Sequence, residues 1–99
     1  MLKQSYYEAI IQIRPATKEI LDFIKKKIEE RKGVFVSKME ELKTGVDLYV
    51  SDQRFARALS KQLKRTFRGE VKLTRKLHTV SKSSGKKLYR VTVLFRLKE

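Results

Sequence analysis

The sequence has 99 residues, a formal net charge of +14 and no Cys, and its length suits one domain built around one hydrophobic core. The lack of Cys excludes disulfides, thiolate zinc sites and a cysteine nucleophile. No apolar run has the roughly 18 residues of a membrane-spanning helix, and the N-terminus lacks a signal-peptide pattern, so we expect a soluble, cytoplasmic protein with a single domain over residues 1–99.

The N-terminal third of the sequence predicts a strand followed by a helix. Residues 5–14 alternate apolar and polar side chains with a period of two, which is typical of a strand with one buried face. Thr17 is a favourable N-cap residue, apolar residues then recur at helical spacing, and Gly33 is a natural C-terminal stop. We therefore expect a helix between Thr17 and Gly33.

The middle of the sequence predicts a strand pair and a second helix. Residues 34–36 begin a strand, and the alternation in residues 44–50 predicts its antiparallel partner, with residues 38–43 as the connection. Residues 51–52 then supply caps for a helix that runs to about Phe67.

The last third of the sequence predicts a long β-hairpin. Residues 70–80 and 88–98 form the two strands, and the turn residues of 81–87 join them. The resulting order β-α-β-β-α-β-β contains the split β-α-β unit of ferredoxin-like folds, with one strand added at the end. The predicted fold class is therefore α+β, a ferredoxin-like split β-α-β sandwich with a long C-terminal hairpin.

Positive charge is concentrated in the second half of the sequence. Residues 1–50 hold 10 basic and 8 acidic side chains, whereas residues 51–99 hold 15 basic and 3 acidic ones. Such a one-sided excess favours a polyanionic partner, and nucleic acid is the leading candidate. An anionic membrane is a weaker candidate, because the apolar residues of the basic helix are needed for the core. We expect no membrane partner.

The second predicted helix places its cations opposite its apolar stripe. With about 100° of rotation per residue, the stripe that starts at Phe55 and ends at Leu63 lies across the helix from the basic sector. No acidic residue lies three or four positions away to compensate the repulsion, which favours an external anion over the alternative of a merely solvated face. The cations are Arg54, Arg57, Lys61, Lys64, Arg65 and Arg68.

The predicted hairpin carries the same charge, and Arg96 extends it along the last strand. Small residues and Lys at a hairpin tip suit a phosphate backbone, although a flexible solvated turn is the alternative. We expect the cations of the helix and of the hairpin to merge into one continuous nucleic-acid surface. The hairpin candidates for nucleic-acid binding are Lys72, Arg75, Lys76, Lys82, Lys86, Lys87 and Arg90.

Base recognition and enzyme chemistry have weaker support in the sequence. Tyr6, Tyr49 and Tyr89 are candidates to stack bases on the sheet face away from the helices, but residues 43–50 keep only part of the RNA-recognition octapeptide. Phosphate and shape contacts are therefore favoured. His78 is the only His and the glycines are dispersed, so we expect no enzyme, no metal site and no cofactor.

An ordered set of short motifs resembles the Nmd-three family. The most specific are residues 45–49, similar to the family's Gly-Leu-Asp-Phe-Tyr, and residues 74–77, similar to its Ser-Lys-Lys-Leu. The resemblance extends from about Tyr6 to Leu97. The family's N-terminal Cys-X-X-Cys zinc region and its C-terminal export signal are missing, so we expect an internal domain or a truncated, archaeal-type relative.

The resemblance implies a role in the biogenesis of the large ribosomal subunit. The family is the export adaptor of that subunit in eukaryotes, and its archaeal relatives are thought to act in subunit maturation. It implies ribosomal RNA or the large subunit as the partner, with a ribosomal protein as a further one, while export does not carry over. The alternative is a protein-interaction module that binds a ribosomal protein or an assembly factor through its sheet. We expect a monomer.

Overall fold

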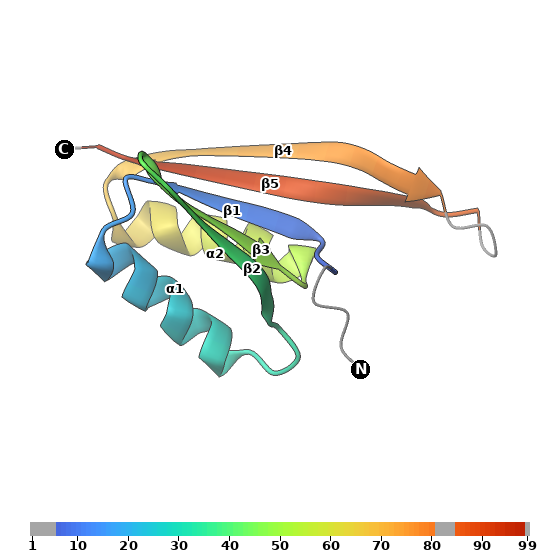
Figure 1. The fold of residues 1–99 in the computed structure, drawn as a ribbon, viewed down its shortest axis with the longest axis horizontal. Helices are drawn as coiled ribbons and strands as arrows, with labels where there is room; N and C mark the ends of the chain where they lie inside the picture. The colour runs from blue at the N-terminus through green and yellow to red at the C-terminus, as the bar shows by residue number, and fades with distance from the viewer. Residues whose placement is uncertain (1–5, 81–84, 99) are drawn as a thin grey trace.

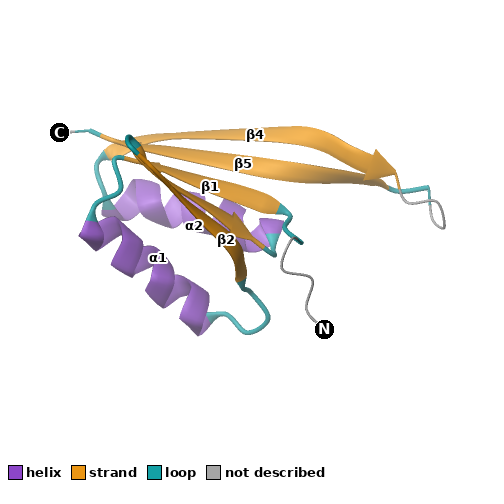
Figure 2. Cartoon of the chain, in the orientation of Figure 1, coloured by secondary structure: helices purple, strands orange, loops and turns teal. Residues whose placement is uncertain are grey.

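The computed structural model describes residues 6–80 and 85–98, in which a five-stranded sheet carries two helices on one face (Figures 1 and 2). The order of the elements along the chain is the predicted β-α-β-β-α-β-β. The elements are β1 (Ala9–Arg14), α1 (Lys18–Glu30), β2 (Val36–Leu42), β3 (Gly45–Val50), α2 (Gln53–Thr66), β4 (Gly69–Val80) and β5 (Lys87–Leu97).

The strands of the sheet follow the order β2-β3-β1-β5-β4. β3 lies between β1 and β2 and is antiparallel to both, so the predicted split β-α-β unit is present. A ferredoxin-like sheet would pair the strand after α2 with β1, but here β5 takes that place, parallel to β1, and β4 pairs with the far side of β5. The α+β class is confirmed, whereas the complete ferredoxin-like order is not.

Burial explains the central place of β5. Val91, Val93 and Phe95 have no exposed surface, whereas Leu73 and Leu77 of β4 are 46% and 50% exposed. The strand with the larger apolar face gains most from neighbours on both sides, because burial of apolar area is the main favourable term in folding. The added strand therefore lies inside the sheet and β4 becomes the edge.

The hydrophobic core lies between the sheet and the two helices. Alternate residues of the inner strands point into it, as the period-two patterns predict, and the apolar stripes of α1 and α2 close it from the other side. We refer to the opposite side of the sheet, which no described element covers, as the open face (Figure 2). The core residues are Ala9, Ile11, Ile13, Ile20, Ile24, Val46, Leu48, Val50, Phe55, Ala56, Leu59, Leu63, Val91, Val93 and Phe95.

The helices begin where the cap residues predict. The Thr17 hydroxyl accepts a hydrogen bond from the backbone N–H of Ile20 at 3.3 Å. The Asp52 carboxylate accepts from the N–H groups of Arg54 and Phe55 at 2.8 and 3.1 Å. Each cap satisfies N–H groups that have no partner within the helix, and this fixes the first turn.

The prediction that residues 38–43 only connect two strands is wrong. Most of this segment belongs to β2, and the chain turns at residues 43–44. Lys38 pairs with Tyr49, and Glu41 pairs with Val46. β2 is an edge strand with exposed side chains, so its charged residues hide the alternation on which a strand prediction depends.

The β4–β5 hairpin extends beyond the rest of the sheet (Figure 1). β1 begins at Ala9, opposite Val91, so the part of β5 that precedes Val91 has only β4 as a neighbouring strand among the described residues. We refer to residues 75–80 and 85–90 as the arm. The arm contributes to the elongated shape of the protein, whose principal extents are 47 × 27 × 25 Å.

Candidate nucleic-acid interface

The outer face of α2 is basic, as predicted. The helix buries Phe55, Leu59 and Leu63 against the sheet, and its cations point away from them. All of these cations are exposed, and within residues 6–80 and 85–98 none of them forms an ion pair. The α2 face consists of Arg54, Arg57, Lys61, Lys64, Arg65 and, just after the helix, Arg68.

The hairpin places three of its candidate cations on the other side of the sheet. Side chains that face each other across an antiparallel pair share one face. Lys72 pairs with Leu94, and Lys76 pairs with Arg90, in alternation with the core residues Val91 and Val93. Lys72, Lys76 and Arg90 therefore point to the open face, away from α2.

The expectation of one continuous basic surface is therefore wrong. The α2 cations lie on the outside of the helix layer, and the even-numbered cations of β4 lie on the open face, with the sheet between them. Arg75 shares the helix side, because it pairs with the core residue Val91. Lys86 and Lys87 are exposed at the far end of the arm, and Lys82 lies outside the described residues.

Arg90 anchors the arm in addition to adding charge. Its Nε donates to the backbone oxygen of Tyr7 at 3.2 Å, and its Nη1 to the Tyr7 hydroxyl at 3.1 Å. The guanidinium also lies 3.9 Å from the centre of the Tyr7 ring, and that of Arg75 lies 4.6 Å from the centre of the Tyr89 ring. Such contacts stabilise a partly buried cation and fix its position. Composition alone does not reveal this pairing.

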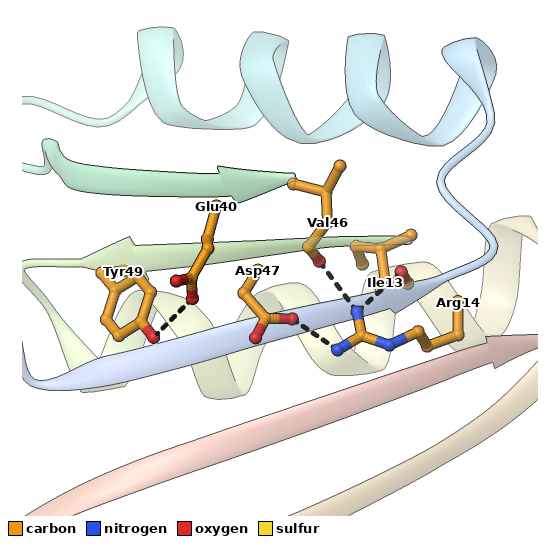
Figure 3. Close-up of polar contacts among 6 residues, drawn as sticks. All are labelled: Ile13, Arg14, Glu40, Val46, Asp47 and Tyr49. Carbon is orange, nitrogen blue, oxygen red and sulfur yellow. Dashed lines mark hydrogen bonds and ion pairs between the residues drawn. The ribbon is translucent and has the colours of Figure 1, made fainter. Parts of the chain in front are cut away.

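The three candidate tyrosines do not form one stacking platform. Tyr49 faces the open side, where its hydroxyl donates to the Glu40 carboxylate at 3.3 Å (Figure 3). Burial and the nearby Glu40 carboxylate raise the pKa of Tyr49. Tyr89 shares the helix side of the hairpin with Val91. The expected set of stacking residues is thus divided between faces.

Tyr6 lies beside the N-terminal end of α2. Its hydroxyl donates to the Glu8 carboxylate, and this hydrogen bond raises the pKa of Tyr6 to about 12. The Glu8 carboxylate also accepts from the N–H of Gln53 at 2.9 Å. Together with Asp52, Glu8 occupies the N–H groups that an anion would use at a helix N-terminus. Anion binding by α2 therefore depends on its side chains.

The described part of the chain contains no cluster of three or more His, Cys, Asp or Glu side chains that could hold a metal ion. His78 is exposed on β4, where the pairing with β5 is irregular between Leu77 and Thr79. Among the described helices, none is long and apolar enough to cross a membrane.

Comparison with known proteins identifies a family. A family model described as NMD3, second domain, matches residues 6–97. The match includes β1 through β5 and therefore both the α2 face and the hairpin. The comparison with curated proteins found no match.

Proposed function

Since the chain belongs to the NMD3 family, whose second domain it matches, we propose that it is a non-enzymatic, cytoplasmic and monomeric domain that binds ribosomal RNA phosphates during biogenesis of the large ribosomal subunit. The family takes part in ribosomal subunit export and biogenesis and associates with the large subunit. For this chain, the proposed contacts are made by cationic side chains of α2 and of the hairpin.

The observation that carries the proposal is the uncompensated charge of the α2 face. The ion pairs of the described residues lie elsewhere, for example between Arg14 and Asp47 and between Lys27 and Glu30. Cations grouped without carboxylates repel each other, and phosphates that neutralise them also release condensed counterions. A nucleic-acid backbone therefore stabilises this arrangement in a way that solvent alone does not.

The separation of the two basic groups changes the expected mode of binding. A flat contact with one RNA helix cannot engage the α2 face and the open face together, because the sheet lies between them. We expect two separable contacts, with the domain positioned between two RNA segments. Loss of one contact should then weaken binding without abolishing it.

The test is salt-dependent binding to a structured fragment of large-subunit ribosomal RNA. If about six phosphates are neutralised, the log-log slope of affinity against salt should be roughly −4 to −5. Replacing Lys61, Lys64 and Arg65 with Ala should make the slope shallower by about 2 to 3. The thermal unfolding temperature should not change, because these side chains are exposed.

A matched control removes the same charge from α1. Lys18, Lys25 and Lys26 are exposed on α1, and their replacement with Ala should leave the slope nearly unchanged. A slope near zero for the unmodified protein would contradict the proposal. An equal effect of the two triple variants would also contradict it, since binding would then depend only on net charge.

The sheet edge supports a second candidate function, binding of a ribosomal protein or an assembly factor. Val36, Met39 and Leu42 of the edge strand β2 are 37%, 55% and 42% exposed, and edge strands can pair with a partner strand. Partner binding that survives high salt and is lost in Met39→Lys would support this function. Binding that disappears at high salt would exclude it.

A further inference from the structure

A hollow of about 640 Å³ opens where β1, β5 and the β2–β3 turn end together. We propose that this hollow binds one nucleotide of single-stranded RNA, with its phosphate between Lys43 and Arg96 and its sugar or base against Leu94. The proposal rests on the proposed RNA-binding function and adds a site on the open face to it. Other lining residues that take part are Gln12, Arg14 and Leu97.

One wall of the hollow is held in place by Arg14. Its Nη2 donates to the Asp47 carboxylate at 2.6 Å, and its Nη1 donates to the carbonyl oxygens of Ile13 and Val46 at 3.0 and 3.2 Å (Figure 3). The side chains of Arg14 and Asp47 are only 19% and 10% exposed. Their charges compensate each other, so this pair is a fixed wall and not a free cation.

Gly45 makes this wall possible. A Cβ atom at residue 45 would lie 1.9 Å from the backbone oxygen of Ile13 and 3.0 Å from the side chain of Arg14. Only a residue without a side chain allows β3 to approach β1 so closely. Gly45 and Asp47 belong to the motif of residues 45–49, and the structure gives both a role in shaping the hollow.

The charges left free at the hollow are those of Lys43 and Arg96. Both side chains are exposed, and over the described residues neither has an ion pair, a hydrogen bond or a ring contact. Glu70 lies opposite Arg96 across the β4–β5 pair, but its carboxylate contacts the Lys98 ammonium at 3.3 Å. Two unpaired cations therefore flank the half-buried Leu94, and Leu97, which also packs against the core, lines the edge of the hollow.

The row of cations along β4 and β5 favours RNA as the ligand. From Arg96 the open face continues to Lys72, opposite Leu94, and then to Lys76 beside Arg90. At about 3.3 Å per residue, the distance from Arg96 to Arg90 along β5 is about 20 Å. A phosphodiester strand supplies anions at regular intervals over such a length, and its sugars and bases can contact the apolar surface between them.

The test uses a fluorescent, unstructured oligouridine of about ten nucleotides. Its affinity is measured for the unmodified chain and for the double variant Lys43→Glu with Arg96→Glu. A matched control carries Lys25→Glu with Lys26→Glu, which has the same charge change at exposed positions of α1 outside the hollow. Circular dichroism verifies that each variant is folded.

We expect the hollow variant to bind the oligonucleotide about tenfold or more weakly, and the control variant to change much less. Photocrosslinking with 4-thiouridine should mark the segment around residues 94–97 in the unmodified chain and not in the hollow variant. Equal losses in the two variants, or a crosslink that persists in the hollow variant, would overturn the proposal. Equally effective competition by polyglutamate would also overturn it, because the site would then accept any polyanion.

The α2 triple variant separates this inference from the proposed function. If the α2 variant loses affinity for structured ribosomal RNA while the hollow variant binds oligouridine normally, the hollow proposal fails and RNA contact by the α2 face is supported. If the α2 variant binds structured RNA normally while the hollow variant loses affinity for oligouridine, nucleotide binding in the hollow is supported and the proposed α2 contact fails.

Discussion

The central strands and the arm use the same alternating pattern with opposite results. In β5, Val91 and Val93 have no exposed surface, because α1 and α2 cover that side of the sheet. In the outer part of the hairpin, Leu77 and Leu88 remain 50% and 46% exposed. Alternation therefore specifies that a strand has two faces, whereas burial depends on whether another layer reaches it.

The central strands and the edge strand β4 also differ in how they compensate charge. The sheet end holds the Arg14–Asp47 pair largely out of water. The ion pair of the hairpin, Lys98 with Glu70, has side chains that are 63% and 69% exposed. Uncompensated cations on the hairpin and on α2 keep the positive potential available to a ligand. The compact part thus stabilises the fold, while the exposed charges remain accessible for the proposed binding.

The largest difference in stability between the two regions is expected when a buried side chain of the core and an exposed one of the arm are each truncated. Phe95→Ala should lower the free energy of unfolding by about 3 to 5 kcal/mol, because Phe95 is fully buried. Leu77→Ala on the arm should lower it by less than about 1 kcal/mol, because half of that side chain already contacts water. Urea denaturation measures both values. Similar losses would mean that the arm contributes to the core.

The two ion pairs provide the next contrast. Asp47→Ala should lower the free energy of unfolding by about 2 to 3 kcal/mol, because it leaves the nearly buried Arg14 guanidinium without its counterion. Glu70→Ala should cost less than about 0.5 kcal/mol, because an exposed pair is screened by solvent. Asp47→Asn is the control that retains shape without charge. Equal costs for Asp47→Ala and Glu70→Ala would remove this difference between the regions.

A helix cap can test whether the arm opens independently. Asp52→Ala removes the N-cap of α2 and should cost about 1 kcal/mol. Amides of β1 should then exchange with deuterium about fivefold faster, since they exchange through global unfolding. Amides of Leu77 and Tyr89 should not change, because local opening of the arm already controls their exchange. A uniform increase would show that the arm and the core unfold together.

The smallest effect concerns Tyr6, whose pKa is raised to about 12 mainly by its hydrogen bond to Glu8. Between pH 10 and about 12 the unfolded chain has lost this proton while the folded chain retains it. The stabilising contribution is therefore present below pH 10 and is lost as the pH rises through about 12.

The measurement for Tyr6 is an ultraviolet titration of tyrosinate. Glu8→Gln should lower the pKa of Tyr6, because it replaces a carboxylate with a neutral acceptor. Tyr6→Phe identifies the transition that belongs to this residue. An unchanged titration of Tyr6 in Glu8→Gln would contradict the assigned cause.

Local patterns located most of the elements and part of the site. Thr17 and Asp52 cap the helices as predicted, and the stripe opposite the α2 cations is buried. The second strand was predicted at residues 34–36, but its extent through Leu42 was missed, because its charged residues carry no alternating signal. The contact between Arg90 and Tyr7 was also missed, because it joins residues 83 positions apart, which no local pattern relates.

The sequence by itself determined the element order, the core residues and the charge of α2, because each follows from the local periodicity of apolar residues and from composition. The tertiary structure decided the rest. It inserted β5 beside β1, put the two cation groups on opposite sides of the sheet, and brought Lys43 to the same hollow as Arg96. These results depend on strand pairing between distant segments, which is settled by competition for burial across the whole chain.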